Sequence, residues 1–308
     1  MRRRHSGAGS RWAHPQSAKA TVFPQVQHVS TGESSACAAG CLSGSRSLAG
    51  GGPIRQSGAA KGPMNADADL ITARLRGLSD TPADPAPIIR TGLPFYGVSL
   101  GDMESIARQW LREHPQAGPA EVLALADELW GRAIREEMVT ATYLVNRHRE
   151  ALERFGARRI DRWGRLLDNW ETTDNLGGRV VGPWAVLDPP DRIAVLERLT
   201  ARRNPYLRRL ALVGCVWFGR RGDSGRWWPQ ISAIVLSLAD DEEASIPKAV
   251  SWVLREHLRH SRDQVAAFLD EYGGRLPAVA RRETRTKMAT GTKTGRRAGR
   301  DPDQAGRR

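Results

Sequence analysis

Apolar side chains recur every three or four residues from about residue 95 to residue 274, the spacing that puts them on one face of an α-helix. No convincing segment shows the apolar–polar alternation of a half-buried strand. Asn204-Pro205 suits a helix start, because Asn caps and Pro tolerates the first helical position. The best-marked helical segments contain Ile106, Trp110 and Leu111; Val122, Leu129 and Trp130; Met138, Leu144 and Val145; Ile193, Leu196 and Leu199; and residues 207–217, 227–238 and 245–257.

Consecutive amphipathic helices joined by short loops predict an all-α fold, a curved solenoid of antiparallel HEAT-like helix pairs. No strict sequence repeat is visible, and a compact helical bundle is the competing architecture. A first short helix is expected over about residues 66–78, and a Pro-rich linker, residues 81–94, separates it from the body.

The two ends of the chain differ in composition from the body. Residues 1–63 are rich in Gly, Ser, Ala and Arg, and we expect them to be disordered. They resemble an organelle transit peptide, but a start codon placed too early gives the same pattern, and we favour the second explanation because Met64 opens a more protein-like stretch. Residues 64–289 are the expected functional domain, and residues 290–308 an expected disordered basic tail.

The formal net charge of +13 is concentrated at the ends. Residues 1–63 carry eight Lys and Arg against one acid, and residues 275–308 carry eleven against three, so the body is close to neutral. Such tails associate with polyanions without selecting among them. The three Cys form no disulfide framework, and the seven His show no ligand spacing, so we expect neither a metal nor another cofactor. The sequence contains no run of 18 apolar residues, so it predicts no membrane span.

In residues 163–174, a row of apolar side chains is followed by an acidic one. If residues 163–174 are one helix, Trp163, Leu167, Trp170 and Asp174 lie on one side of it. Asp174 is then either a solvated acid at a helix end or an acid held beside an indole face, because burying an unpaired carboxylate is costly.

Basic residues gather further along the chain. Seven Arg and one acid lie between Ala201 and Trp228, which indicates either a phosphate-facing surface or a solvated helix face. Part of this run falls near the boundary of a buried helix face, which favours binding. On the helix of residues 245–257, Trp252 shares the polar stripe with two cations, an arrangement suited to a sugar-phosphate backbone, or else it docks on the next helix pair. The DNA-binding candidates are Arg203, Arg208, Lys248 and Arg255.

Three runs together resemble one family. They are Trp170-Glu-Thr-Thr-Asp174, the run from Arg203 to Ala211 that contains Arg208-Arg209, and Lys248-Ala-Val-Ser-Trp252-Val-Leu-Arg-Glu256. In this order they resemble the bacterial DNA alkylation repair glycosylases of the HEAT-like-repeat, AlkD-like type, over about residues 93–287. The resemblance implies a cleft formed by Trp170, Asp174, Arg209 and Trp252. The family often has Asp where Glu171 stands here, which puts the packing of the cleft in question.

The resemblance implies an alkylpurine DNA N-glycosylase that acts on duplex DNA containing alkylated bases. A purine alkylated at N3 or N7 is cationic and leaves the sugar without a general acid. An ionised Asp174 can then stabilise the positive charge on the sugar and orient a water, as carboxylates of glycosidases do. Trp170 and Trp252 would offer π-faces to the cationic nucleotide, and Arg209 would hold a phosphate.

The alternative is a non-catalytic HEAT-like scaffold that binds DNA or a protein through the same concave face. For the catalytic reading we expect a cytoplasmic bacterial monomer, associated with the nucleoid when bound to DNA, with no role at a membrane.

Overall fold

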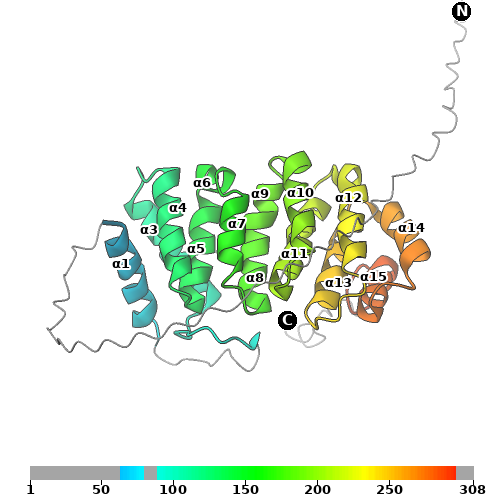
Figure 1. Ribbon diagram of the computed structural model, residues 1–308, viewed down its shortest axis with the longest axis horizontal. Helices are drawn as coiled ribbons and strands as arrows, with labels where there is room; N and C mark the ends of the chain where they lie inside the picture. Colours follow the sequence, from blue (N-terminus) through cyan, green and yellow to red (C-terminus); the bar gives the residue numbers. More distant parts are fainter. Residues whose placement is uncertain (1–62, 80–88, 296–308) are drawn as a thin grey trace, which may run out of the picture. The chain divides into compact units, whose positions relative to one another are not determined.

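The computed structural model describes residues 63–79 and 89–295, and every regular element within these ranges is a helix (Figure 1). The all-α fold predicted from hydrophobic spacing is therefore confirmed for the described part of the chain. The elements are α1 (Pro63–Gly77), α3 (Leu100–Glu113), α4 (Pro119–Gly131), α5 (Arg135–Arg147), α6 (Arg149–Glu153), α7 (Ala157–Gly164), α8 (Trp170–Leu176), the π-helical turn η1 (Gly177–Val181), α9 (Gly182–Ala185), α10 (Pro189–Leu199), α11 (Pro205–Gly219), α12 (Ser224–Ser237), α13 (Ile246–His257), α14 (Arg262–Tyr272) and α15 (Ala278–Thr290).

Most of the helices stack in chain order as two rows, as in a superhelical solenoid, and α1 packs against α3 and α4 at the first end of the stack (Figure 1). One row contains α3, α5, the continuous segment α8–η1–α9, α11, α13 and α15, each packed against the next. The other row contains α4, α6, α10, α12 and α14, and it covers the first row from one side. Helices α8, α11 and α13 are thus consecutive neighbours although their sequences are far apart.

The helix starts follow the local sequence. Asn204 caps α11, because its side-chain oxygen accepts a hydrogen bond from the Tyr206 amide at 2.9 Å, and Pro205 is the first helical residue, as expected. The helix expected over residues 66–78 is α1, which begins three residues earlier. Helix α14 was not marked by the sequence analysis. The expectations for residues 1–62, 80–88 and 296–308 fall outside the described residues.

The expectation that residues 163–174 form one continuous helix is wrong. Helix α7 ends at Gly164 and α8 begins at Trp170, so Trp163 does not share a stripe with Asp174. The Asn169 side chain accepts from the Thr172 amide at 2.9 Å and so starts a new helix. Trp163 instead lies in the core, stacked on Trp130 with ring centroids 4.3 Å apart. Trp170 and Asp174 remain four residues apart on one face of α8.

Two glycines allow the α8–η1–α9 segment to lie close against α11. A Cβ atom on Gly177 would come within 2.6 Å of the Val213 side chain, and one on Gly182 within 2.3 Å of the Trp217 ring. Larger residues at either position would push the two helices apart. This close packing fixes the distance between the carboxylate on α8 and the guanidinium on α11.

Candidate active site

Helix α8 carries an exposed indole and a mostly buried carboxylate on one face. The Trp170 side chain is 38% exposed, which is unusual for a large aromatic in this fold. Asp174 lies one turn further on, where its side chain is 20% exposed. An acid and an indole therefore face the same side of the helix, at the end that is open to solvent.

Asp174 forms a two-pronged ion pair with Arg209 of α11. The Arg209 Nε donates to Oδ1 of Asp174 at 2.8 Å, and Nη2 donates to Oδ2 at 2.7 Å. The remaining nitrogen, Nη1, donates to the backbone carbonyl of Ser245, the residue before α13. Since the Arg209 side chain is only 7% exposed, its guanidinium joins three neighbouring helices at one buried point.

Burial and charge act on the Asp174 carboxyl in opposite directions. Burial raises the pKa of Asp174 above its ordinary value, and the nearby Glu171 carboxylate raises it further. The hydrogen bonds and positive charge of Arg209 lower the same pKa. On balance the pKa of Asp174 is raised, and Arg209 limits that rise. The carboxylate is thus held beside one cation in a poorly solvated place where an anion is most effective electrostatically.

A groove of about 670 Å³ opens beside this ion pair. It is large enough for a nucleotide. Its walls come from the starts of α8, α11 and α13 and from the segment that precedes residue 92. The lining residues are Ile89, Arg90, Trp170, Asp174, Tyr206, Arg209, Glu243, Ala244, Ser245 and Lys248.

The segment before α3 is tied to the start of α8. The Gly92 amide donates to Oδ2 of Asp168 at 2.7 Å, and the Thr91 hydroxyl donates to both oxygens of the same carboxylate at 2.9 Å. These bonds bring Ile89 and Arg90 to the groove. The sequence analysis treated this stretch as the end of a linker, because nothing local in it signals a contact 76 residues further along the chain.

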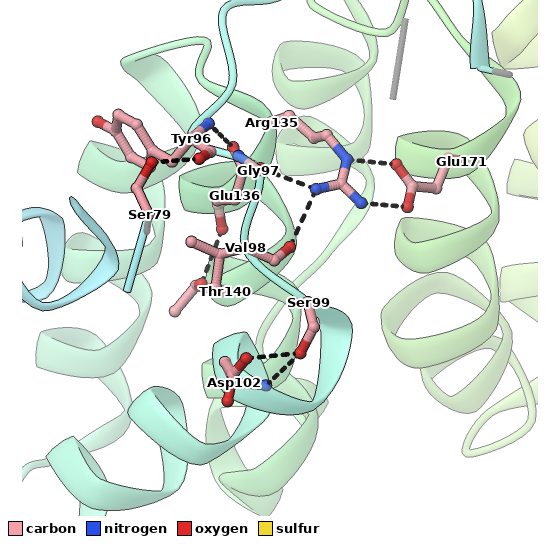
Figure 2. Close-up of polar contacts among 10 residues, drawn as sticks. All are labelled: Ser79, Tyr96, Gly97, Val98, Ser99, Asp102, Arg135, Glu136, Thr140 and Glu171. Atoms are coloured by element: carbon pink, nitrogen blue, oxygen red, sulfur yellow. Dashed lines mark hydrogen bonds and ion pairs between the residues drawn. The ribbon is translucent and has the colours of Figure 1, made fainter. Parts of the chain in front are cut away.

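A second ion pair joins α8 to α5 (Figure 2). Arg135 at the start of α5 donates to both oxygens of Glu171, at 2.7 and 2.6 Å. The same guanidinium donates to Glu136 at 2.8 Å and to the Val98 carbonyl at 3.3 Å. Glu171 is therefore a positioning residue, because it fixes the rotation of the helix that carries Trp170 and Asp174. Both oxygens of Glu171 are bonded to Arg135, so the structure has room and a partner for Glu at this position.

The structure brings together four of the eight residues expected in the site: Trp170, Asp174, Arg209 and Lys248 line one groove. Trp252 does not line it; its ring is half-buried and packs against the core, one turn beyond Lys248. Arg203 is exposed on the loop before α11. Arg255 donates to the Ser251 hydroxyl at 3.1 Å, close to Glu283.

Two arginines have partners other than the expected phosphate. Arg209 uses Nε, Nη1 and Nη2 within the protein, so its first role is to hold Asp174. Arg208 donates to Asp241 at 2.5 and 3.1 Å, and to the carbonyls of Arg202 and Arg203. Sequence alone could not separate an arginine that faces solvent from one that ties two loops together.

The sequence analysis missed Tyr206 and Glu243 as groove residues. Tyr206 lies inside the run from Arg203 to Ala211, and Glu243 lies two residues before the helix of residues 245–257, but neither has a spacing that signals a site. Among the described residues no group of three His, Cys, Asp or Glu side chains could hold a metal ion. Within the same ranges, no helix is long and apolar enough to cross a membrane.

The fold and the groove define an all-α superhelical protein with a carboxylate–guanidinium pair beside an exposed indole. The family model for DNA alkylation repair enzymes matches residues 79–288, and the chain therefore belongs to that family, with a role in DNA repair. A solved structure from Enterococcus faecalis, described as a predicted DNA alkylation repair enzyme, is similar in fold: the TM-score is 0.54 at 17% identity, over 74% of this chain and 97% of that one. No curated protein matches the sequence.

Proposed function

We propose that the protein is a DNA glycosylase that hydrolyses the N-glycosidic bond of purines alkylated at N3 or N7 in duplex DNA. The observation that carries the proposal is the Asp174–Arg209 pair beside the exposed Trp170 in a groove of nucleotide size. Membership of the family supports the role in DNA repair, and the residues of the groove support the hydrolysis of the glycosidic bond.

The leaving base needs no proton, because alkylation has already made it cationic. The positive charge that grows on the deoxyribose is what the enzyme has to stabilise, and a fixed carboxylate in a poorly solvated place does this well. Asp174 has that environment, and Arg209 lowers its pKa against the effect of burial and aligns the carboxylate. The same carboxylate orients the water that attacks the sugar.

Trp170 gives the groove a π-face at its solvent side. An exposed indole attracts a cationic base or sugar and stacks on it. Trp252 stays a predicted contact for DNA that extends beyond Lys248 along α13. Trp252 is four positions, or about one turn, beyond Lys248 on α13, so a duplex that continues along this helix can reach both side chains.

A non-catalytic DNA scaffold is the alternative function. The pair of Asp174 with Arg209 joins α8, α11 and α13 in a scaffold as well as in an enzyme. DNA is an anion, however, so a scaffold that holds only the phosphate backbone gains nothing in binding from a carboxylate that faces the groove. A catalyst of glycosidic cleavage requires it. The carboxylate at the groove therefore favours the enzyme.

Release of 7-methylguanine from a duplex oligonucleotide tests the proposal directly. We expect the natural protein to release the free base and leave an abasic site that alkali converts to a strand break. An undamaged duplex of the same sequence is the control. Binding of the methylated duplex without release of the base would support the scaffold instead.

Lys248 is the groove cation that we expect to contact a phosphate. Its side chain is exposed, and none of the ion pairs found in the described part of the chain involves it. Lys248→Ala should reduce the slope of log K against log salt by about one, since one phosphate contact is lost. Fluorescence anisotropy of an undamaged duplex at several salt concentrations measures the slope.

Lys293→Ala is the matched control for Lys248→Ala. Lys293 lies beyond α15 and pairs with Glu283 at 3.3 Å, outside the groove. The two variants have the same change in net charge. An equal change of slope in both would show that only net charge matters and would remove the phosphate contact from Lys248.

A further inference from the structure

Glu243 places a second carboxylate in the groove. It lines the same groove as Asp174, and its side chain is half-exposed. Asp174 is held in a two-pronged ion pair by Arg209, whereas the Glu243 carboxylate makes no hydrogen bond or ion pair with any residue that the structure describes. The hydrogen bond to Asp241 raises the pKa of Arg208, and the negative charge of Glu243 adds to that rise. Because Arg208 is bonded to Asp241, Glu243 is, of the two acids in the groove, the one without a bonded cation.

The turn that carries Glu243 is held firmly. The Glu243 amide donates to Oδ1 of Asp241 at 3.0 Å, and its carbonyl accepts from the Ile246 amide at 2.9 Å. Asp241 is itself fixed by both prongs of Arg208. Arg208 therefore acts through Asp241 as a positioning residue, and the backbone of Glu243 is set before any ligand arrives.

The Glu243 carboxylate acts on Tyr206, in the first turn of α11. Burial raises the pKa of the Tyr206 phenol, and the negative charges of Glu243 and Asp168 raise it further. Tyr206 is three residues before Arg209 and lines the same groove. Glu243 is therefore on the side of its turn that faces the Asp174–Arg209 pair.

An unpaired carboxylate in a groove that receives DNA needs an explanation, because it repels the phosphates. A ligand with a positive charge removes this disadvantage. Purines alkylated at N3 or N7 have such a charge on the base, and undamaged purines do not. The groove thus has one acid for the sugar and one that is free for the base.

We propose that Glu243 is a specificity-determining residue, whose unpaired carboxylate recognises the positive charge of the alkylated base and so favours cationic over neutral lesions. The inference rests on the proposed function. It adds a discrimination that Asp174 does not provide, since Asp174 is directed at the sugar and is already paired.

Two duplexes of the same shape and different charge test the inference without any cleavage. One contains 2′-fluoro-arabino-7-methylguanine, which is cationic and resists hydrolysis. The other contains 7-deaza-7-methylguanine on the same 2′-fluoro-arabino sugar, which is neutral. The natural protein should bind the cationic duplex more tightly. Glu243→Gln should reduce the ratio of the two dissociation constants by about fivefold, because the contact with the charge of the base is lost for the cationic duplex only, whereas the loss of repulsion from the phosphates favours both duplexes equally.

Glu242→Gln is the matched control. Glu242 is the neighbouring residue on the same turn, it is exposed, and it does not line the groove, so the change in charge is the same. It should leave the ratio unchanged. The inference is overturned if the natural protein does not distinguish the two duplexes, if Glu243→Gln keeps the natural ratio, or if both variants change it equally.

Release of 7-methylguanine, measured on the same preparations, separates this inference from the proposed function. If the base is released and Glu243→Gln keeps the natural binding ratio, the glycosylase function is supported and the role of Glu243 in recognising charge is contradicted. If no base is released and the ratio still depends on Glu243, charge recognition stands and the glycosylase falls.

Discussion

Asp174→Asn should lower the rate of 7-methylguanine release by about 10²- to 10³-fold, the usual effect of removing one group that stabilises charge in a transition state. Asn has nearly the same shape and can still accept one hydrogen bond from Arg209, but it has no negative charge to offer the sugar. Single-turnover release from a methylated duplex with enzyme in excess measures the chemical step directly.

Binding of DNA should behave differently from release. Because Asp174→Asn removes a negative charge from the groove, the undamaged duplex should bind as tightly as before or more tightly. Asp161→Asn is the matched control, since Asp161 pairs with Arg202 and does not line the groove. A release rate in Asp174→Asn within a few-fold of the control would rule out Asp174 as the catalytic carboxylate.

The fold could be predicted from the sequence because helical periodicity is a local signal. Ile106, Trp110, Leu129 and Leu144 are each buried on the face that their spacing indicated. The prediction failed between residues 163 and 174, where the spacing continues across a break. Asn169 could have been identified as a cap, since Asn is favoured at that position and weak inside a helix.

The site was predicted in part, for a different reason. Trp170, Asp174, Arg209 and Lys248 came from the resemblance or from charge patterns, and the structure places them in one groove. Which partner each side chain has depends on contacts between distant parts of the chain. No local pattern shows that Arg208 holds Asp241 or that Arg135 holds Glu171.

The long-range contacts also explain why Glu243 escaped notice. In the sequence it is the last of four consecutive acids, a pattern typical of a solvated helix start. In the structure Asp241 is paired and Glu242 is exposed, and Glu243 faces the groove. The difference among the three is set by Arg208, which fixes the turn.

Arg209→Met should destabilise the protein by about 3 kcal/mol at neutral pH, because it leaves the Asp174 carboxylate buried without its cation. This value is at the lower end of the range for breaking a buried ion pair, since a fifth of the Asp174 side chain is exposed. The pKa of Asp174 should rise further, since the two contributions of Arg209 that lower it are lost. Denaturant unfolding measures the stability, and the pH profile of kcat/KM should show its acid limb moved to higher pH.

The pH dependence of this loss identifies its cause. A carboxyl whose pKa is higher in the folded than in the unfolded protein destabilises the fold when it is ionised, and the penalty disappears as the pH falls and the group takes up a proton. The deficit of Arg209→Met should therefore be largest at neutral pH and shrink on acidification. Adding Asp174→Asn to Arg209→Met should restore much of the stability and none of the activity, because the double variant has no buried charge and no catalytic carboxylate. A deficit that is equal at neutral and acidic pH, or that persists in the double variant, would mean that Arg209 stabilises the fold through packing and the Ser245 carbonyl and not through Asp174.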